Sequence, residues 1–239
     1  MNVLIACEES QRVCTEFRRL GHNAYSCDVQ EPSGGHPEWH ILGDVLEVLN
    51  PKITSHEDGY IRYVYGEIRF RTMDGTEHCI DGRWDLIIAH PPCTYLSNAG
   101  ARHLWKGHEL NQERYAKGLD AKAFFMQFYN ADCERICVEN PVPSRVYKLP
   151  DYTQTIQPYQ FGHPFTKRTC LWLKGLQKLE PTEIVEPAAT FCPSGSYSHK
   201  HGDQHRGLFT KDRAKNRSKT FPGIARAMAE QWGGQHEDA

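Results

Sequence analysis

Residues 2–21 read NVLIACEESQRVCTEFRRLG and point to the fold class. Residues 2–7 form an apolar run without polar alternation, which is typical of a strand buried on both faces of a parallel sheet. Residues 10–20 then place apolar side chains at helical spacing, with Ser10 as the expected N-cap and Gly21 as the stop. The stretch therefore predicts a strand–loop–helix unit of an α/β domain.

Apolar runs and helical patterns continue to alternate along the rest of the chain. Further strands are predicted over 23–29, 40–45, 84–90 and 134–140, and further helices over 111–132 and 221–234. The longer helix is expected to pack through Leu119, Ala123, Phe124 and Phe128. This alternation predicts a mostly parallel sheet within a single domain that spans residues 1–239.

One insertion interrupts the alternation at residues 51–83. The insertion is rich in aromatic and β-branched side chains and carries turn signals at Tyr65-Gly66 and Asp74-Gly75. These features predict an inserted β-hairpin.

The sequence changes character again at 150–216. Residues 153–161 and 168–173 are strand-like and flank a Gly162-His163-Pro164 turn, so we expect an antiparallel hairpin at the sheet edge. A Pro-, Ser-, Gly- and His-rich loop follows, and residues 217–239 are expected to carry the C-terminal helix.

Composition limits the function classes. The 239-residue chain is 39% hydrophobic, which is enough for a buried core, and its formal net charge is −2. A near-neutral balance excludes a surface built throughout for polyanions, so any nucleic-acid site must be a local patch. We expect a cytoplasmic monomer without a membrane segment, because no apolar run reaches the roughly 20 residues that span a bilayer. Nine cysteines without Cys-x-x-Cys pairs predict reduced thiols.

Chemistry-bearing residues follow the predicted strands, where ligands of parallel sheets bind. They are Cys7 and Glu8 after the first strand, Asp28, Asp44, Cys93 and Glu139. Carbon 5 of cytosine attacks a methyl donor only after activation, which a thiolate on C6 and an acid at N3 provide. Cys93 and Glu139, at neighbouring strand ends, supply that pair of groups.

Three motifs resemble the cytosine-C5 DNA methyltransferase family. DLIIAHPPCTYLS (85–97) resembles its Pro-Cys nucleophile motif, ICVENPVP (136–143) its Glu-Asn motif, and FTKRTCLWL (165–173) its Arg-containing strand. The resemblance implies that Cys93 attacks C6, Glu139 contacts N3, and Arg168 steadies the base. The substrate implied is cytosine-containing DNA, and the chain is similar to short members of phage or prophage type that lack a full target-recognition domain.

The resemblance also implies a Rossmann-like methyltransferase fold that binds S-adenosylmethionine. Asp28 resembles the acid that binds ribose hydroxyls, Gly43-Asp44-Val45 the adenine motif, and RSKTFPGIARAMAEQW (217–232) the final motif, whose helix returns to the cofactor pocket. The implied cofactor contacts are Cys7, Glu8, Ser10, Asp28, Val29, Asp44, Val45 and Pro91. The chain departs from the family in its first loop, ACEESQR (6–12), which lacks glycine.

Candidate nucleic-acid contacts lie in two places. Tyr95 and Ser97 follow Cys93, and Tyr95 and Trp105 are close enough to it in sequence to flank a flipped base. A basic run carries cations at alternate positions, Lys211, Arg213, Lys215, Arg217 and Lys219, which suits a row of phosphates.

Simpler interpretations stand beside these. Asp28 and Asp44 are also ordinary turn caps by residue type, and Arg168 also suits a surface position. Cys192, His199, His201 and His205 fit no standard zinc spacing, so no metal is expected. Three alternative functions remain open: exocyclic-amine methylation, methylation of RNA or a free nucleotide, and nucleic-acid binding without turnover.

Overall fold

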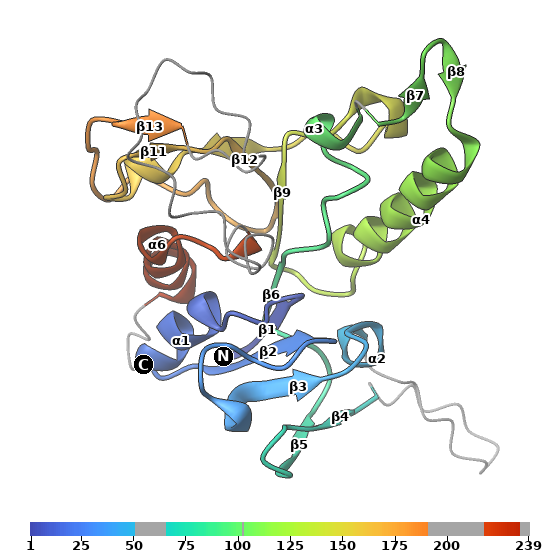
Figure 1. Cartoon of the computed structure of the whole chain (residues 1–239). Coiled ribbons are helices and arrows are strands. Elements are labelled where there is room, and N and C mark those ends of the chain that lie inside the picture. The colour runs from blue at the N-terminus through green and yellow to red at the C-terminus, as the bar shows by residue number, and fades with distance from the viewer. Residues whose placement is uncertain (51–65, 102, 191–217, 235–239) are drawn as a thin grey trace, which may run out of the picture.

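A central sheet organises the chain, as a computed structural model shows for residues 1–50, 66–101, 103–190 and 218–234 (Figure 1). The sheet has seven strands, ordered from one edge to the other as β10 (Gln154–Ile156), β12 (Thr169–Lys174), β9 (Ile136–Pro141), β6 (Leu86–Ala89), β1 (Asn2–Ala6), β2 (Asn23–Asp28) and β3 (His40–Leu42). Neighbouring strands are parallel except at β12, which is antiparallel to β9 and β10. The predicted α/β class with a mostly parallel sheet is confirmed.

Helices pack on both faces of the sheet. In the described ranges the helices are α1 (Arg12–Arg19), α2 (Leu46–Leu49), α3 (Asn98–Ala101), α4 (Gln112–Tyr129) and α6 (Pro222–Gly233). Val3 and Ile5 of β1 share a core cluster with α1 and α6, whereas Leu4 and Ala6 share a second cluster with α2 and α4. Because successive side chains of a strand alternate between faces, an unbroken apolar run such as β1 fits this two-sided burial.

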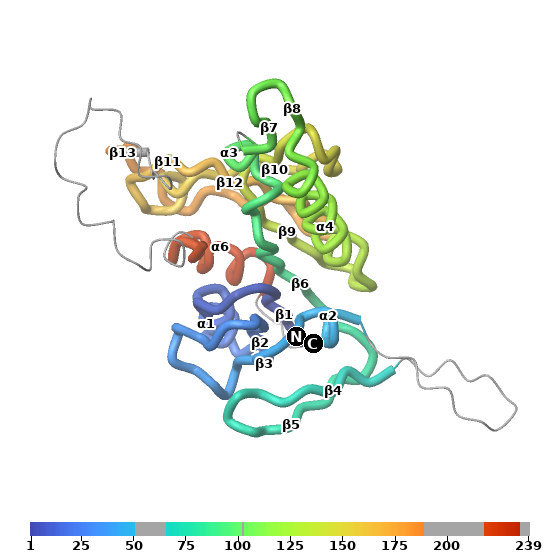
Figure 2. Tube along the Cα trace, turned by 45° about the vertical axis from the view of Figure 1, so that its right-hand side comes forward, coloured from blue at the N-terminus to red at the C-terminus, as the bar shows by residue number. Residues whose placement is uncertain are grey.

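The insertion contains the predicted hairpin. β4 (Ile68–Arg71) and β5 (Glu77–Ile80) pair antiparallel around the Asp74-Gly75 turn, where Gly75 has a φ of 90°. Figure 2 shows this hairpin extending from the β3 end of the molecule, and Phe70 packs on Tyr25 with ring centroids 4.8 Å apart. The other turn predicted in the insertion, Tyr65-Gly66, is not tested, because residues 51–65 lie outside the described residues.

The packing face of α4 differs from the prediction. Leu119 is 44% exposed and Ala123 is also exposed, whereas Phe125 and Phe128 are fully buried. At Gly118 the helix packs directly against the side chain of Tyr147, so closely that a Cβ on Gly118 would lie 2.1 Å from the tyrosine ring. The prediction was thus wrong for Leu119 and Ala123 and confirmed for Phe128, which is in the core, and for Phe124, which packs against it. The contact at Gly118 could not be predicted, because Tyr147 lies far along the chain.

The predicted hairpin at the sheet edge is confirmed, since β10 and β12 pair antiparallel and close the sheet. Their connection is more elaborate than a simple turn. The shorter elements of the chain are β11 (Phe165–Thr166), β13 (Ala189–Thr190), β7 (Trp105–Lys106), β8 (Glu109–Leu110), η1 (Pro37–Trp39), η2 (Arg145–Tyr147) and η3 (Pro158–Gln160). Among the described helices, none combines the length and apolar character needed to cross a membrane.

Candidate active site

The strand order places a switch point between β1 and β6. From β1 the chain leads outward to β2 and β3 on one side, while β6 and β9 lie on the other side. The N–H of His90, just after β6, donates to the carbonyl of Ala6 at the end of β1 (2.9 Å). Ligands of open parallel sheets bind outside the carboxyl ends of strands at such a point. The candidate site therefore lies where the loops after β1 and β6 meet.

Glu8, after β1, caps helix α1. Its Oε1 accepts from the N–H of Val13 (2.7 Å) and its Oε2 from the N–H of Cys14 (3.2 Å). The expected N-cap at Ser10 was wrong, because the N-cap position is Gln11 and the Ser10 hydroxyl instead donates to Glu8 Oε1 (3.4 Å). Burial raises the pKa of the Glu8 carboxyl, while the nearby His90 and the two helix N–H groups oppose that rise.

This cap determines what the first loop can bind. The N-terminus of the first helix is where Rossmann-like proteins hold a pyrophosphate, through backbone N–H groups and the helix dipole. Here a buried carboxylate, Glu8, already uses the N–H groups of Val13 and Cys14. The site is thus unsuited to a phosphate-bearing dinucleotide and compatible with a cofactor that has no phosphate.

The loop also reaches its shape without glycine. Cys7 and Gln11 adopt left-handed backbone conformations, with φ of 58° and 56°. Such a conformation costs a non-glycine residue about 1–3 kcal/mol, so neighbouring contacts must hold it. The Gln11 amide does so, donating to the carbonyl of His36 (2.8 Å) and accepting from the N–H of the same residue (3.1 Å). Gly34 allows this close approach, because a Cβ there would lie 2.6 Å from Gln11 Cβ.

Three of the predicted cofactor residues meet at the ends of β1, β2 and β3. The pKa of the Cys7 thiol is raised, first by burial and then by the negative charges of Asp28 and Asp44. Each aspartate also caps its own turn, since Asp28 Oδ1 accepts from the N–H of Gln30 (2.9 Å) and Asp44 Oδ1 from the N–H of Leu46 (3.0 Å). The turn-cap interpretation is therefore confirmed for both residues, and within the described ranges the second carboxylate oxygen of each accepts no hydrogen bond.

Apolar side chains stand exposed beside these two acids. Val29 is 76% exposed, and Leu42 and Leu46 are 47% and 38% exposed. Large apolar residues grouped at the ends of two adjacent strands suit an apolar ring of a ligand. Val45, by contrast, is buried in the core, so its contribution to this end is packing.

A buried histidine–carboxylate pair occupies the other half of the edge. His90 Nδ1 lies 2.9 Å from Glu139 Oε2, and the two side chains are only 8% and 16% exposed. Within the described part of the chain, His90 Nε2 is buried and makes no hydrogen bond. Sequence reasoning gave His90 no role beside Glu139, because His90-Pro91-Pro92 favoured only the alternative of amine methylation; a histidine directly after a buried strand was the available signal.

The charges of this pair support each other. Burial alone lowers the pKa of His90, but the bond to Glu139 and the charges of Glu139 and Glu8 outweigh it, so the pKa is raised. Burial alone raises the pKa of Glu139, but the His90 bond and charge, with a further contribution from Lys167, lower it. Both shifts favour the charged forms of the two side chains, an imidazolium beside a carboxylate.

Cys93 lies in a loop that runs along the end of β9. The amide of Asn140 donates to the carbonyl of Pro91 (2.8 Å), which holds this predicted cofactor residue in a buried position. Farther along, the N–H of Asn98 donates to Val142 (2.8 Å) and that of Ser144 to Leu96 (2.7 Å). Because these hydrogen bonds join the two segments and β6 pairs with β9, the Cys93 loop lies beside the end of the strand that carries Glu139. Cys93 itself, between the bonded positions, is partly exposed.

The cation that acts on Glu139 is Lys167. In the register of β12 with β9, Leu171 lies opposite Glu139, and Cys170 alternates to the other face. The predicted Arg168 is exposed and its charge acts on Cys170 instead. Lys167 lines a small cavity with Glu139, Thr169, Thr220, Phe221 and Ile224, of about 10 Å³. The segment that begins the expected final motif thus reaches Glu139.

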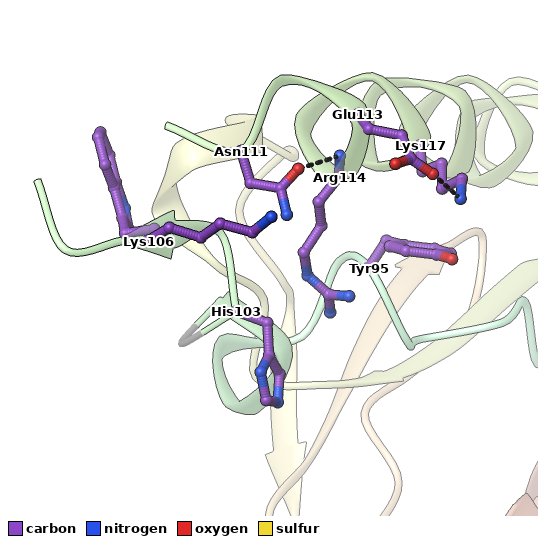
Figure 3. Close-up of a pocket in the computed structure, with 8 residues that line it drawn as sticks. Tyr95, His103, Lys106, Asn111, Glu113, Arg114 and Lys117 are labelled. Carbon is purple, nitrogen blue, oxygen red and sulfur yellow. Dashed lines mark hydrogen bonds and ion pairs between the residues drawn. The ribbon is translucent and has the colours of Figure 1, made fainter. Parts of the chain in front are cut away.

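The remaining predicted contacts divide into two groups. Ser97 is buried and its hydroxyl accepts from the N–H of Gly100 (3.2 Å), so it supports the loop after Cys93. Tyr95 lies on the wall of a second, open hollow (Figure 3). The cations Lys211, Arg213, Lys215 and Arg217 and the group Cys192, His199, His201 and His205 lie outside the described residues.

No protein-family model matches the chain, and no curated protein sequence is significantly similar to it. A functional proposal therefore depends on the chemistry of the strand ends.

Proposed function

We propose that the chain transfers a methyl group from S-adenosylmethionine to carbon 5 of cytosine in DNA. The observation that carries the proposal is the placement of a partly exposed thiol, Cys93, and a largely enclosed carboxylate, Glu139, after neighbouring strands of the sheet. The strand order supports it. Numbered along the chain, the sheet strands run 3-2-1-4-5-7-6, which is the Rossmann-like order with one reversed strand inserted near the edge. We infer that this is the methyltransferase variant of the fold.

The first half of the edge fits this cofactor. S-adenosylmethionine carries no phosphate, which agrees with the capping of α1 by the Glu8 carboxylate. Asp28 and Asp44 would accept from ribose hydroxyls and the adenine amine, and the exposed Val29 and Leu42 would contact the ring. When bound, the cofactor supplies an electrophilic methyl group.

The second half would activate the cytosine. The Cys93 thiolate adds to C6, and the new C–S bond moves an electron pair toward N3. The His90–Glu139 pair holds one transferable proton, which passes from Nδ1 through the carboxyl group to N3 and leaves a neutral imidazole. When a water molecule later takes the proton from C5, the freed electron pair re-forms the C5–C6 double bond, the C6–S bond breaks, the thiolate leaves, and N3 returns its proton to the pair.

Lys167 and the cavity beside Glu139 complete the proposal. A positive charge near Glu139 favours its carboxylate form between turnovers. The cavity of about 10 Å³ has room for roughly one water molecule, so entry of a pyrimidine requires the side chains around it to move. Extrusion of the base from a duplex costs a few kcal/mol in addition.

The test is the product. DNA from cells that express the wild-type chain is digested to nucleosides and compared by mass spectrometry with DNA from cells expressing Cys93→Ala. We expect 5-methylcytosine only with the wild type. Methyl groups on an exocyclic nitrogen, retained in Cys93→Ala, would instead select amine methylation. RNA from the same cells is digested in parallel, and methylation found in RNA alone would exclude DNA as the substrate.

A further inference from the structure

A second concave site lies beside the loop that carries Cys93. It is an open hollow of about 530 Å³, within the size range of sites that hold a nucleotide-sized ligand (Figure 3). Its walls come from three segments: the Cys93 loop, the β7–β8 hairpin and the first turns of α4. The residues that matter are Tyr95, Trp105, Lys106, Glu113, Arg114 and Lys117.

The charge of this hollow is positive in a chain whose formal net charge is −2. Lys106, Arg114 and Lys117 face one carboxylate, Glu113, and that carboxylate accepts from Lys117 Nζ (2.6 Å). Among the described residues, Lys106 and Arg114 make no ion pair with a carboxylate. A local excess of cations is what a near-neutral protein needs to hold a phosphodiester backbone.

Aromatic rings accompany these cations. Trp105 is 51% exposed on β7, and the guanidinium of Arg114 lies 5.0 Å from the centroid of the Tyr95 ring. Cationic grooves with exposed aromatic rings bind single-stranded nucleic acid, because the cations hold phosphates while unstacked bases stack on the rings. A small anion without an aromatic ring would gain nothing from the exposed indole, because it has no ring to stack on it.

Hydrogen bonds connect the hollow to the loop that carries the proposed nucleophile, Cys93. Arg114 Nη2 donates to the carbonyls of Thr94 (3.2 Å) and Gly100 (3.1 Å), on either side of the turn that follows Cys93. A strand held at Arg114 and Lys106 is therefore within one loop of the thiol.

We propose that this hollow binds the DNA strand beside the target cytosine, with phosphates on Lys106 and Arg114 and an unpaired base on Trp105. The proposal rests on the proposed function for the identity of the target base, whereas binding itself requires no turnover. A nucleic-acid contact surface is thereby assigned to residues of α4 and the β7–β8 hairpin.

The test is binding of a fluorescent single-stranded DNA oligonucleotide, rich in cytosine, by the full chain without cofactor at several salt concentrations. Lys106→Ala should weaken binding and reduce the salt slope by about 0.7. Trp105→Ala should weaken binding about tenfold without changing the slope, because stacking is uncharged. Trp105→Phe should bind nearly as the wild type does.

Lys178→Ala is the matched control, because Lys178 is exposed on a segment away from the hollow. Wild-type affinity of both Lys106→Ala and Trp105→Ala would overturn the inference, as would tighter binding of RNA than of DNA of the same sequence. If these variants weaken binding but cells yield no 5-methylcytosine, the hollow stands and the proposed function fails. If cells yield 5-methylcytosine and neither variant changes binding, the proposed function stands and the inference about the hollow fails.

Discussion

The ends of β2 and β3 and the ends of β6 and β9 share one edge of the sheet, yet their side chains have opposite environments. At the first pair, Asp44 and Val29 are open to solvent. At the second, His90 and Glu139 are almost enclosed and tied to each other. Open acids beside exposed aliphatic side chains suit reversible binding, whereas enclosed, coupled charges suit proton transfer, because a low-dielectric setting strengthens their interaction. The comparison assigns binding to one half and chemistry to the other.

The largest expected effect separates the two halves directly. Cys93→Ser should reduce methyl transfer by at least about a thousandfold, because the hydroxyl is a much weaker nucleophile than the thiolate. Cofactor binding by calorimetry and the melting temperature should stay near the wild-type values, since Cys93 is partly exposed and outside the core. Loss of cofactor affinity in this variant would show that the halves are not independent.

The next effect concerns the buried pair. His90→Asn should reduce turnover about a hundredfold, the usual contribution of a general acid. The variant should also change how stability varies with pH. Because the folded pKa of His90 is raised above 6.5, its contribution is complete below that value and is lost as the pH rises through the folded pKa. Between pH 6 and pH 9 the melting temperature should therefore fall more steeply with rising pH for the wild type than for His90→Asn.

His78→Asn is the control for that experiment, because His78 lies on the inserted hairpin and burial lowers its pKa. Its melting curve should keep the wild-type decline at alkaline pH. Equal pH profiles for wild type and His90→Asn would contradict the coupled pair.

The open half should respond in affinity alone. Asp28→Asn should raise the dissociation constant of S-adenosylmethionine about tenfold, the typical effect of one lost charge-assisted hydrogen bond. The rate at saturating cofactor should change little. Unchanged affinity would remove Asp28 from the cofactor site and leave it as the turn cap for Gln30.

The smallest effect tests the first loop. Glu8→Ala should lower the free energy of unfolding by about 1–2 kcal/mol, through loss of the cap on α1. The comparison variant Glu47→Ala, at an exposed site, should be near neutral. Denaturant unfolding gives both values, and a neutral Glu8→Ala would mean that the helix does not depend on this carboxylate.

Much of the fold was readable from local patterns. The run NVLIA has the two-sided burial expected of a central strand, and the Asp74-Gly75 turn closes a hairpin as its residue types demand. The positions of Cys93 and Glu139 at neighbouring strand ends also followed from the alternation of strands and helices. The strand and the turn depend on residues close together in the chain, so their spacing is enough to indicate them, whereas the placement of Cys93 beside Glu139 followed from the general rule that consecutive parallel strands of an α/β sheet neighbour each other.

Other features arise from residues far apart in the chain. His90 meets Glu139 across 49 positions, and Lys167, rather than the neighbouring Arg168, acts on that carboxylate because of the register of β12. Periodicity shows that an element has two faces, but only packing decides what each face meets. The side chains at the sheet edge were thus indicated by sequence, while their partners, burial and charge states came from the tertiary contacts.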